Sequence, residues 1–169
     1  MDRYGFAVGI YGEWLRVSPA ELERAKSNPA WLLDLYDELG GAGYSQRQQG
    51  GRRSGTDKTW QALDYLLTKR GFPVEIIYGE EDFEPDTPMG DSQPTYLTPE
   101  QVRTAAAALA PLSGEDLLTG VEPTDLVDIY PNVWNQPGEL ESAVSYLDDA
   151  KTFFEEAAKA GDAVVCWVR

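Results

Sequence analysis

The sequence of 169 residues contains no histidine and a single cysteine, Cys166. The absence of histidine excludes Ser-His-Asp and Cys-His catalysis, histidine metal sites and the commonest acid–base side chain. One cysteine cannot form a disulfide within the chain, and without histidine it cannot complete a structural zinc site. Cys166 lies in an apolar stretch, where a thiol is expected to be inert packing. We therefore predict no catalytic residue of these classes, no metal and no cofactor.

Long hydrophobic runs are also lacking, because no apolar stretch approaches the ~20 residues that a membrane-spanning helix needs. The first residues, Met1 to Tyr4, show no basic segment followed by an apolar one, so no signal peptide is expected. The length fits one domain over residues 1–169, and a chain of this size can bury a core without disulfides. We expect a single cytoplasmic domain.

Basic residues are scarce, with 14 Lys and Arg against 29 Asp and Glu, for a net charge of −15. Such a charge repels the phosphate backbone of nucleic acids and the surface of anionic membranes. It attracts cations and basic proteins, although a negative surface can also serve solubility alone. The predicted partner is a basic protein, with no nucleic acid and no membrane. No pattern indicates the oligomeric state.

Apolar periodicity and turn residues predict both helices and strands. The capping pattern Ser18–Glu21 starts one helix, and Thr98–Gln101 repeats it at the start of another. Further helices are expected over about 31–39, 56–70 and 113–118, and one long helix over 138–160. Strands are expected over 5–17, 73–78 and 163–168, and the last is continuously apolar, as in a sheet interior.

Two predicted loops differ in charge. The loop at 42–55 is locally basic, with Arg47, Arg52 and Arg53. The loop at 79–94 has no base and carries six acids: Glu80, Glu81, Asp82, Glu84, Asp86 and Asp91. Solvated surface loops are the favoured interpretation of both. The alternative for the first loop is that its three arginines bind an anionic group on a partner.

Weak likenesses to ion-binding loops fall in the same segments. Gly50–Thr56 looks like a phosphate loop, but it lacks the lysine after the final glycine, and Asp57 follows as a negative charge. The acids from Asp82 to Asp86 alternate as in a calcium loop, but Thr87 occupies the place of the turn glycine. Neither segment therefore predicts a bound ion.

Aromatic residues supply the candidate binding site. Tyr and Trp are enriched at binding sites because they combine a broad apolar face with one hydrogen bond, although they also pack cores. The acids are too numerous for any pair to be chosen as catalytic, so no catalytic residue is named. The candidate binding residues are Asp57, Lys58, Trp60, Tyr96, Tyr130 and Trp134. Whether they meet in one exposed concavity or only pack the core is left open.

Several segments, in order, resemble the YfbM-like family of small bacterial proteins, a domain of unknown function. They are Trp14–Glu23, Asp57–Trp60, Leu66–Thr68, Tyr96–Val102, Ile129–Trp134 and Phe153–Val165. The resemblance implies an α/β domain with helices packed on both faces of a mixed β-sheet, with α+β as the alternative, and it implies no activity. Relatives tend to carry histidines after the tryptophan where this chain has Gln61 and Asp64, so any role of those histidines does not transfer.

The leading hypothesis for function is a non-enzymatic protein-binding or regulatory domain with an acidic surface. An immunity-type protein is one form that such a domain could take, because an acidic surface speeds capture of a basic toxin. The alternative is a small-molecule enzyme that uses carboxylate or tyrosine chemistry in a cleft. That cleft would lie near Lys58, Trp60, Tyr96, Tyr130 and Trp134. Enzymatic activity is the less favoured of the two. A second alternative is a structural module whose aromatic residues only pack.

Overall fold

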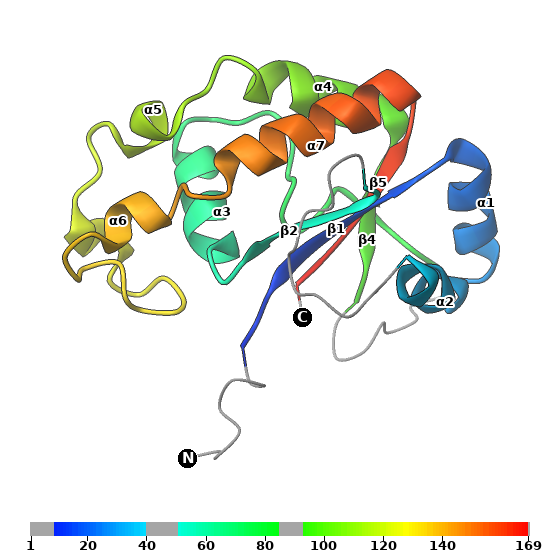
Figure 1. The fold of residues 1–169 in the computed structure, drawn as a ribbon, viewed down its shortest axis with the longest axis horizontal. Coiled ribbons are helices and arrows are strands. Elements are labelled where there is room, and N and C mark those ends of the chain that lie inside the picture. Colours follow the sequence, from blue (N-terminus) through cyan, green and yellow to red (C-terminus); the bar gives the residue numbers. More distant parts are fainter. Residues whose placement is uncertain (1–8, 40–50, 85–92, 169) are drawn as a thin grey trace.

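Figure 1 shows a computed structural model, in which residues 9–39, 51–84 and 93–168 are described. The bounds of the elements, in chain order, are β1 (Gly12–Val17), α1 (Pro19–Ser27), α2 (Trp31–Glu38), β2 (Arg53–Asp57), α3 (Trp60–Lys69), β3 (Glu81–Asp82), β4 (Thr95–Leu97), α4 (Pro99–Leu109), α5 (Gly114–Leu118), η2 (Pro123–Leu126), α6 (Glu139–Ser142), α7 (Leu147–Ala160) and β5 (Ala163–Val168). Among these described residues, no helix has both the length and the apolar character that crossing a membrane requires.

The strands form one sheet in the order β2-β1-β5-β4-β3. Its centre is the pairing of β1 with β5, which runs in register from Gly12 opposite Val168 to Val17 opposite Ala163. This pairing, like those of β1 with β2, β4 with β5 and β3 with β4, is antiparallel. The strand directions are therefore more uniform than the expected mixed sheet.

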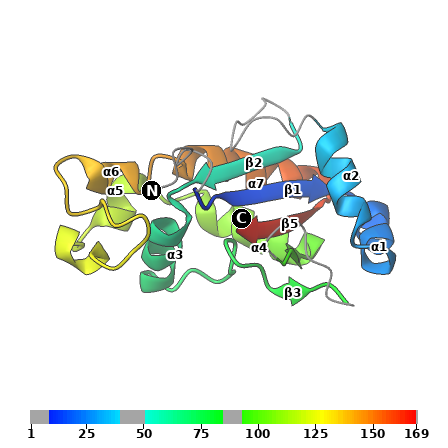
Figure 2. The same ribbon diagram turned by 90° about the horizontal axis from the view of Figure 1, so that it is seen from below.

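Helices cover both faces of the sheet, as Figures 1 and 2 show. Successive residues of a strand point to opposite faces, so β1 sends Trp14 into one core and Leu15 and Val17 into the other. The first core packs against α3, α4 and α7, and the second against α1 and α2. The α/β class with helices on both faces is confirmed. Cys166 of β5 is buried in the first core, and burial raises the pKa of its thiol.

Local hydrogen bonds explain where several helices begin and end. Ser18 Oγ accepts from the backbone N of Glu21 at 3.1 Å, and Glu21 Oε1 accepts from the backbone N of Ser18 at 2.8 Å. Thr98 and Gln101 form the same reciprocal pair at the start of α4. Gly161 ends α7 at a φ of 73°, in the left-handed region that glycine tolerates best. These starts and stops confirm the sequence predictions.

The strand predicted over 73–78 is wrong, because this segment is a series of turns. The carboxylate of Glu75 accepts from two backbone amides just after it, at 3.0 and 3.1 Å, which bends the chain. Trp14 Nε1 donates to the Ile76 carbonyl at 2.7 Å and holds the turn against the sheet. The apolar side chains here reach the core from a turn, which a period-based prediction cannot distinguish from a short strand.

The long helix predicted over 138–160 is also wrong, because α6 and α7 are separated by a turn. Ser145 Oγ donates to the carbonyl of Ser142 at 2.7 Å, so a side chain occupies an acceptor where the first helix ends.

The predicted loop at 42–55 and the helix from 56 need correction as well, since β2 occupies Arg53–Asp57 and α3 begins at Trp60. Pairing with β1 overrides the low strand propensity of these residues. Strand β4 was not predicted. Arg47 of the first loop and the acids Asp86 and Asp91 of the second lie outside the described residues.

Candidate functional site

An aromatic cluster surrounds Trp60 at the start of α3. Its ring stacks on Tyr130, with centroids 5.7 Å apart, and meets Tyr78 edge-on at 6.0 Å. Trp60 Nε1 donates to the carbonyl of Ile10 at 3.0 Å, and the backbone N of Ile10 donates to the Tyr130 hydroxyl at 2.9 Å. The cluster therefore joins the chain before β1, the start of α3 and the segment after η2.

Two side chains hydrogen bond to the backbone of Tyr130, one from α3 and one from four residues further along the chain. Gln61 Oε1 accepts from the backbone N of Tyr130 at 2.6 Å, and Trp134 Nε1 donates to its carbonyl at 3.0 Å. Asn132 has a left-handed φ of 68°. Trp134 is buried, so its ring packs the core while its N–H positions Tyr130. Gln61 therefore has a structural role here.

Asp57 and Lys58 lie on the turn from β2 into α3. Asp57 has a left-handed φ of 52°, a conformation that is uncommon for a residue with a Cβ. Tyr146 donates its hydroxyl proton to Asp57 Oδ2 at 3.2 Å, and Lys58 Nζ lies 5.8 Å from the centre of the Tyr11 ring. Burial, followed by the nearby Asp57 carboxylate, raises the pKa of Tyr146. The hydrogen bond from Tyr146 to Asp57 ties the turn to the chain just before α7.

Tyr96 lies apart from the other candidates. It is on β4, packs against the second core and contacts Phe83, with ring centroids 4.8 Å apart. Lys26 Nζ lies 5.4 Å from the centre of its ring. Trp60 belongs to the first core, on the opposite face of the sheet. The structure thus groups Trp60, Tyr130 and Trp134 and leaves Tyr96 elsewhere.

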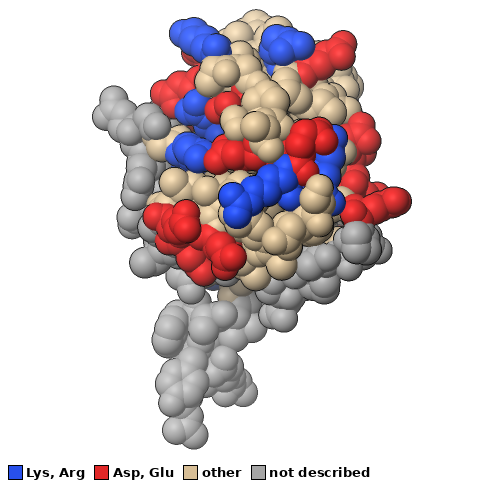
Figure 3. All heavy atoms as spheres, turned by 90° about the vertical axis from the view of Figure 1, so that its right-hand side faces the viewer, with Lys and Arg blue, Asp and Glu red and all other residues tan. Residues whose placement is uncertain are grey.

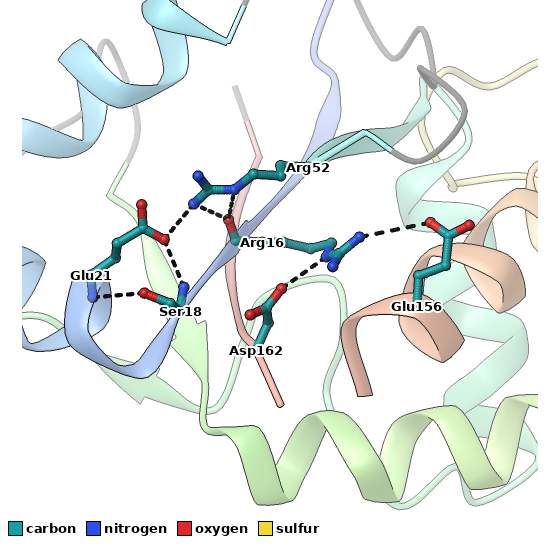
Figure 4. Close-up of polar contacts among 6 residues, drawn as sticks. All are labelled: Arg16, Ser18, Glu21, Arg52, Glu156 and Asp162. Carbon is teal, nitrogen blue, oxygen red and sulfur yellow. Dashed lines mark hydrogen bonds and ion pairs between the residues drawn. The ribbon is translucent and has the colours of Figure 1, made fainter. Parts of the chain in front are cut away.

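The arginines proposed to bind an anion are engaged within the fold. Figure 4 shows Arg52 donating to the carbonyl of Arg16 at 3.0 and 2.8 Å and to Glu21 Oε1 at 2.6 Å. Arg16 in turn binds Asp162 at 3.0 Å and Glu156 at 3.8 Å. Burial raises the pKa of Glu21, but hydrogen bonds from the Ser18 backbone and Arg52 outweigh it, so this pKa is lowered.

Arg53 is buried, and its guanidinium lies 3.8 Å from the centre of the Tyr36 ring while donating to the Tyr36 hydroxyl. Both Arg52 and Arg53 therefore hold β2 to the rest of the domain. This corrects their interpretation as residues of a solvated loop that are available to a partner.

A pair of carboxyl groups, missed in the sequence, lies one helical turn beyond Trp60. Asp64 of α3 is half-buried and hydrogen bonded to Glu75. Two carboxyl groups can share a hydrogen bond only when one of them carries the proton. Burial and then the neighbouring Glu75 raise the pKa of Asp64 to about 7. Burial and then the charges of Asp64 and Glu75 also raise the pKa of Tyr78, whose ring meets Trp60, so the acid pair acts electrostatically on a member of the aromatic cluster.

Asp64 lies between two hollows. One has a volume of about 260 Å3 and is lined by Asp64, Leu67, Thr68, Phe72, Pro73, Val74, Glu75, Ile76 and Glu80. The other has about 440 Å3 and is lined by Gln61, Asp64, Tyr65, Thr68, Lys69 and Ile129. No local sequence motif predicts this pair, because Asp64 lies on a helix and Glu75 on a separate turn. Within the described chain, no group of three potential ligands is placed to hold a metal ion.

A second distinctive region is the acidic end, which we define as residues 113–149, from α5 through η2 and α6 to the first turn of α7. It lies at the left of Figure 1. Residues 104–150 contain no Lys or Arg and nine acids: Glu115, Asp116, Glu122, Asp125, Asp128, Glu139, Glu141, Asp148 and Asp149. Bordering bases bind backbone instead, since Arg70 donates to the carbonyl of Asp116 at 2.6 Å and Lys151 to that of Leu112 at 2.7 Å.

A groove of about 430 Å3 runs between α5 and α6 in this acidic end. It is lined by Gly114, Glu115, Leu118, Thr119, Glu141 and Val144. A Cβ on Gly114 would lie 2.8 Å from Val144 Cγ2, so the glycine permits the close approach of α5 to Val144. The face at the right of Figure 1 differs, because Figure 3 shows basic and acidic side chains interspersed there.

Comparisons with known proteins give a fold and a family. No curated protein sequence matches the chain. A similar solved structure is titled "The Crystal Structure of a Protein of Unknown Function YfbM from Escherichia coli"; it is 17% identical, the alignment covers 94% of this chain and 99% of that chain, and the TM-score is 0.65. At this identity the likeness shows the fold alone. Residues 8–167 match the family described as Domain of unknown function (DUF1877). Both findings confirm the resemblance seen in the sequence, and the chain belongs to the DUF1877 family.

Proposed function

We propose that this protein is a non-enzymatic binding domain that recognises a basic protein in the cytoplasm through its acidic end. The observation that carries the proposal is the gathering of nine acids, with no base among residues 104–150, at one end of the molecule. A one-signed surface attracts an oppositely charged partner and orients it before contact. An immunity-type role, in which the partner is a basic toxin, uses the same attraction.

The distribution of ion pairs supports the acidic end as the binding surface. Arg16, Lys26, Arg52 and Lys159 pair with acids of α1 and α7 and with Asp162. Glu115 and Glu141, which flank the groove, form no ion pair with a base of the described chain. Negative charge at the acidic end is thus available to another molecule.

Photo-crosslinking in the native cell tests the proposal. A benzophenone side chain is placed at Thr119, in the groove, and in a second variant at Asp34, an exposed residue of α2. We expect Thr119 alone to crosslink to a basic protein, and the purified partner to bind more weakly as salt rises. An acidic partner, equal crosslinking from both positions or salt-insensitive binding would overturn the proposal.

A second candidate function, acid–base chemistry on a small molecule, is favoured by the shared proton of Asp64 and Glu75 beside two hollows. Asp64→Asn tests it, because the amide can still donate to Glu75 but cannot release a proton. Hydrolysis or proton exchange of a compound panel by the wild type, lost in this variant, would support an enzyme. Equal rates in the two proteins would contradict it.

A further inference from the structure

We infer that the groove between α5 and α6 receives an arginine side chain of the basic partner. This inference rests on the proposed function and names the group that the acidic end recognises. The walls of the groove, the charges at its rim and its size all fit this side chain.

The walls suit the aliphatic stem of a long side chain. Leu118 and Val144 are half-buried, pack at the edge of the first core and leave an apolar surface in the groove. The volume of about 430 Å3 is at the small end of the range for ligand sites, which fits one long side chain better than a whole helix. Long basic side chains cover apolar surface with their stems while the charged head stays at the rim.

The rim suits the charged head of that side chain. Glu115 on α5 and Glu141 on α6 are both exposed and both line the groove, so one carboxylate comes from each helix. A guanidinium is planar, weakly hydrated and carries several donors, so it can meet two carboxylates and lie on an apolar wall at once. The ammonium of lysine is a compact, strongly hydrated charge and matches this combination less well.

Peptide titration provides the test. The probes are nine-residue Gly/Ser peptides with lysine at both ends and arginine, lysine or uncharged citrulline at the centre. Binding is followed by the methyl NMR signals of Leu118 and Val144. We expect saturable shifts of these methyls with the arginine peptide and an affinity about tenfold lower for the citrulline peptide, which loses the charge-assisted hydrogen bonds. The lysine peptide should fall between them.

Matched variants separate the groove from general charge. Glu115→Gln with Glu141→Gln should weaken the arginine peptide about tenfold, while Asp34→Asn with Glu38→Gln, which changes the net charge equally at α2, should change it less than about twofold. Uniform shifts across the domain, or equal affinity for arginine and citrulline peptides, would overturn the inference. A crosslinked, salt-sensitive partner whose binding ignores Glu115 and Glu141 would also overturn it while retaining the proposed function.

Discussion

The end of the molecule beside α1 and the acidic end differ in how their acidic side chains are paired. Beside α1, bases from distant segments neutralise the acids, as when Arg52 binds Glu21 and Arg16 binds Asp162. At the acidic end, acids cap backbone amides of their own segment: Asp116 accepts from the backbone N of Ser113, and this bond lowers its pKa. The first arrangement links segments that are far apart in the sequence. The second stabilises short helices and leaves the net charge exposed, so we assign stability to one end and recognition to the other.

The largest expected effect is on stability and comes from breaking the ion pair of Arg16 and Asp162 at the end beside α1. Arg16 and Asp162 are only 14% exposed in their side chains, so Arg16→Met leaves a largely buried carboxylate without its base. We expect a loss of about 2–3 kcal/mol in the free energy of unfolding, measured in urea. Lys159→Met, which breaks an exposed pair with Glu155, serves as the control and should cost less than about 0.5 kcal/mol. Equal losses in both variants would contradict the contrast.

A smaller effect on the free energy of unfolding depends on pH and concerns the carboxyl pair of Asp64 and Glu75, which a proton partly neutralises. Because the pKa of Asp64 is about 7 in the folded chain and 3.8 by default, the folded state holds a proton that the unfolded state releases. Its stabilising contribution is therefore complete below about pH 4 and is lost as the pH rises through 7. The half-exposed position screens the effect to about 1–2 kcal/mol.

The comparison protein for this effect is Asp64→Asn, in which that residue does not titrate. Urea unfolding of both proteins from pH 4 to pH 8 should show the wild type losing stability relative to the variant until about pH 7, with little change above it. A difference that does not vary with pH would show that the two carboxyl groups share no proton.

The smallest expected effect on stability comes from reversing two charges at the acidic end. Glu115→Lys with Glu141→Lys should change the free energy of unfolding by no more than about 0.5 kcal/mol, because both side chains are exposed and unpaired with any base of the described chain. The same double reversal should abolish salt-sensitive partner binding. A loss of stability as large as that of Arg16→Met would assign these acids to the fold.

Features set by neighbours in the sequence were predictable. The capping box of Ser18 and Glu21 and the left-handed stop at Gly161 involve contacts of a few residues, so residue type and spacing are enough. The turn at Glu75 and strand β2 were not, because a tryptophan from β1 holds the first and pairing with β1 creates the second. Tertiary contacts of this kind leave no periodic pattern.

The candidate site follows the same rule. Trp60, Tyr130 and Trp134 could be selected by residue type, but nothing local shows that Trp60 and Tyr130 stack while Tyr96 lies on the opposite face. Asp64 was passed over because acids are abundant and its partner Glu75 lies in a segment predicted as a strand. The groove depends on how α5 and α6 approach each other, which no single segment specifies.

The central pairing of β1 with β5 has a consequence for synthesis on the ribosome. Bonded residues such as Arg16 and Asp162 are 146 positions apart, so the middle strand of the sheet is supplied by the last described element. A growing chain can form α1 or α4 early, but both cores stay open until residues 163–168 have left the exit tunnel. We therefore expect the sheet to close only once β5 has emerged, with the unfinished edge of β1 exposed to chaperones until then.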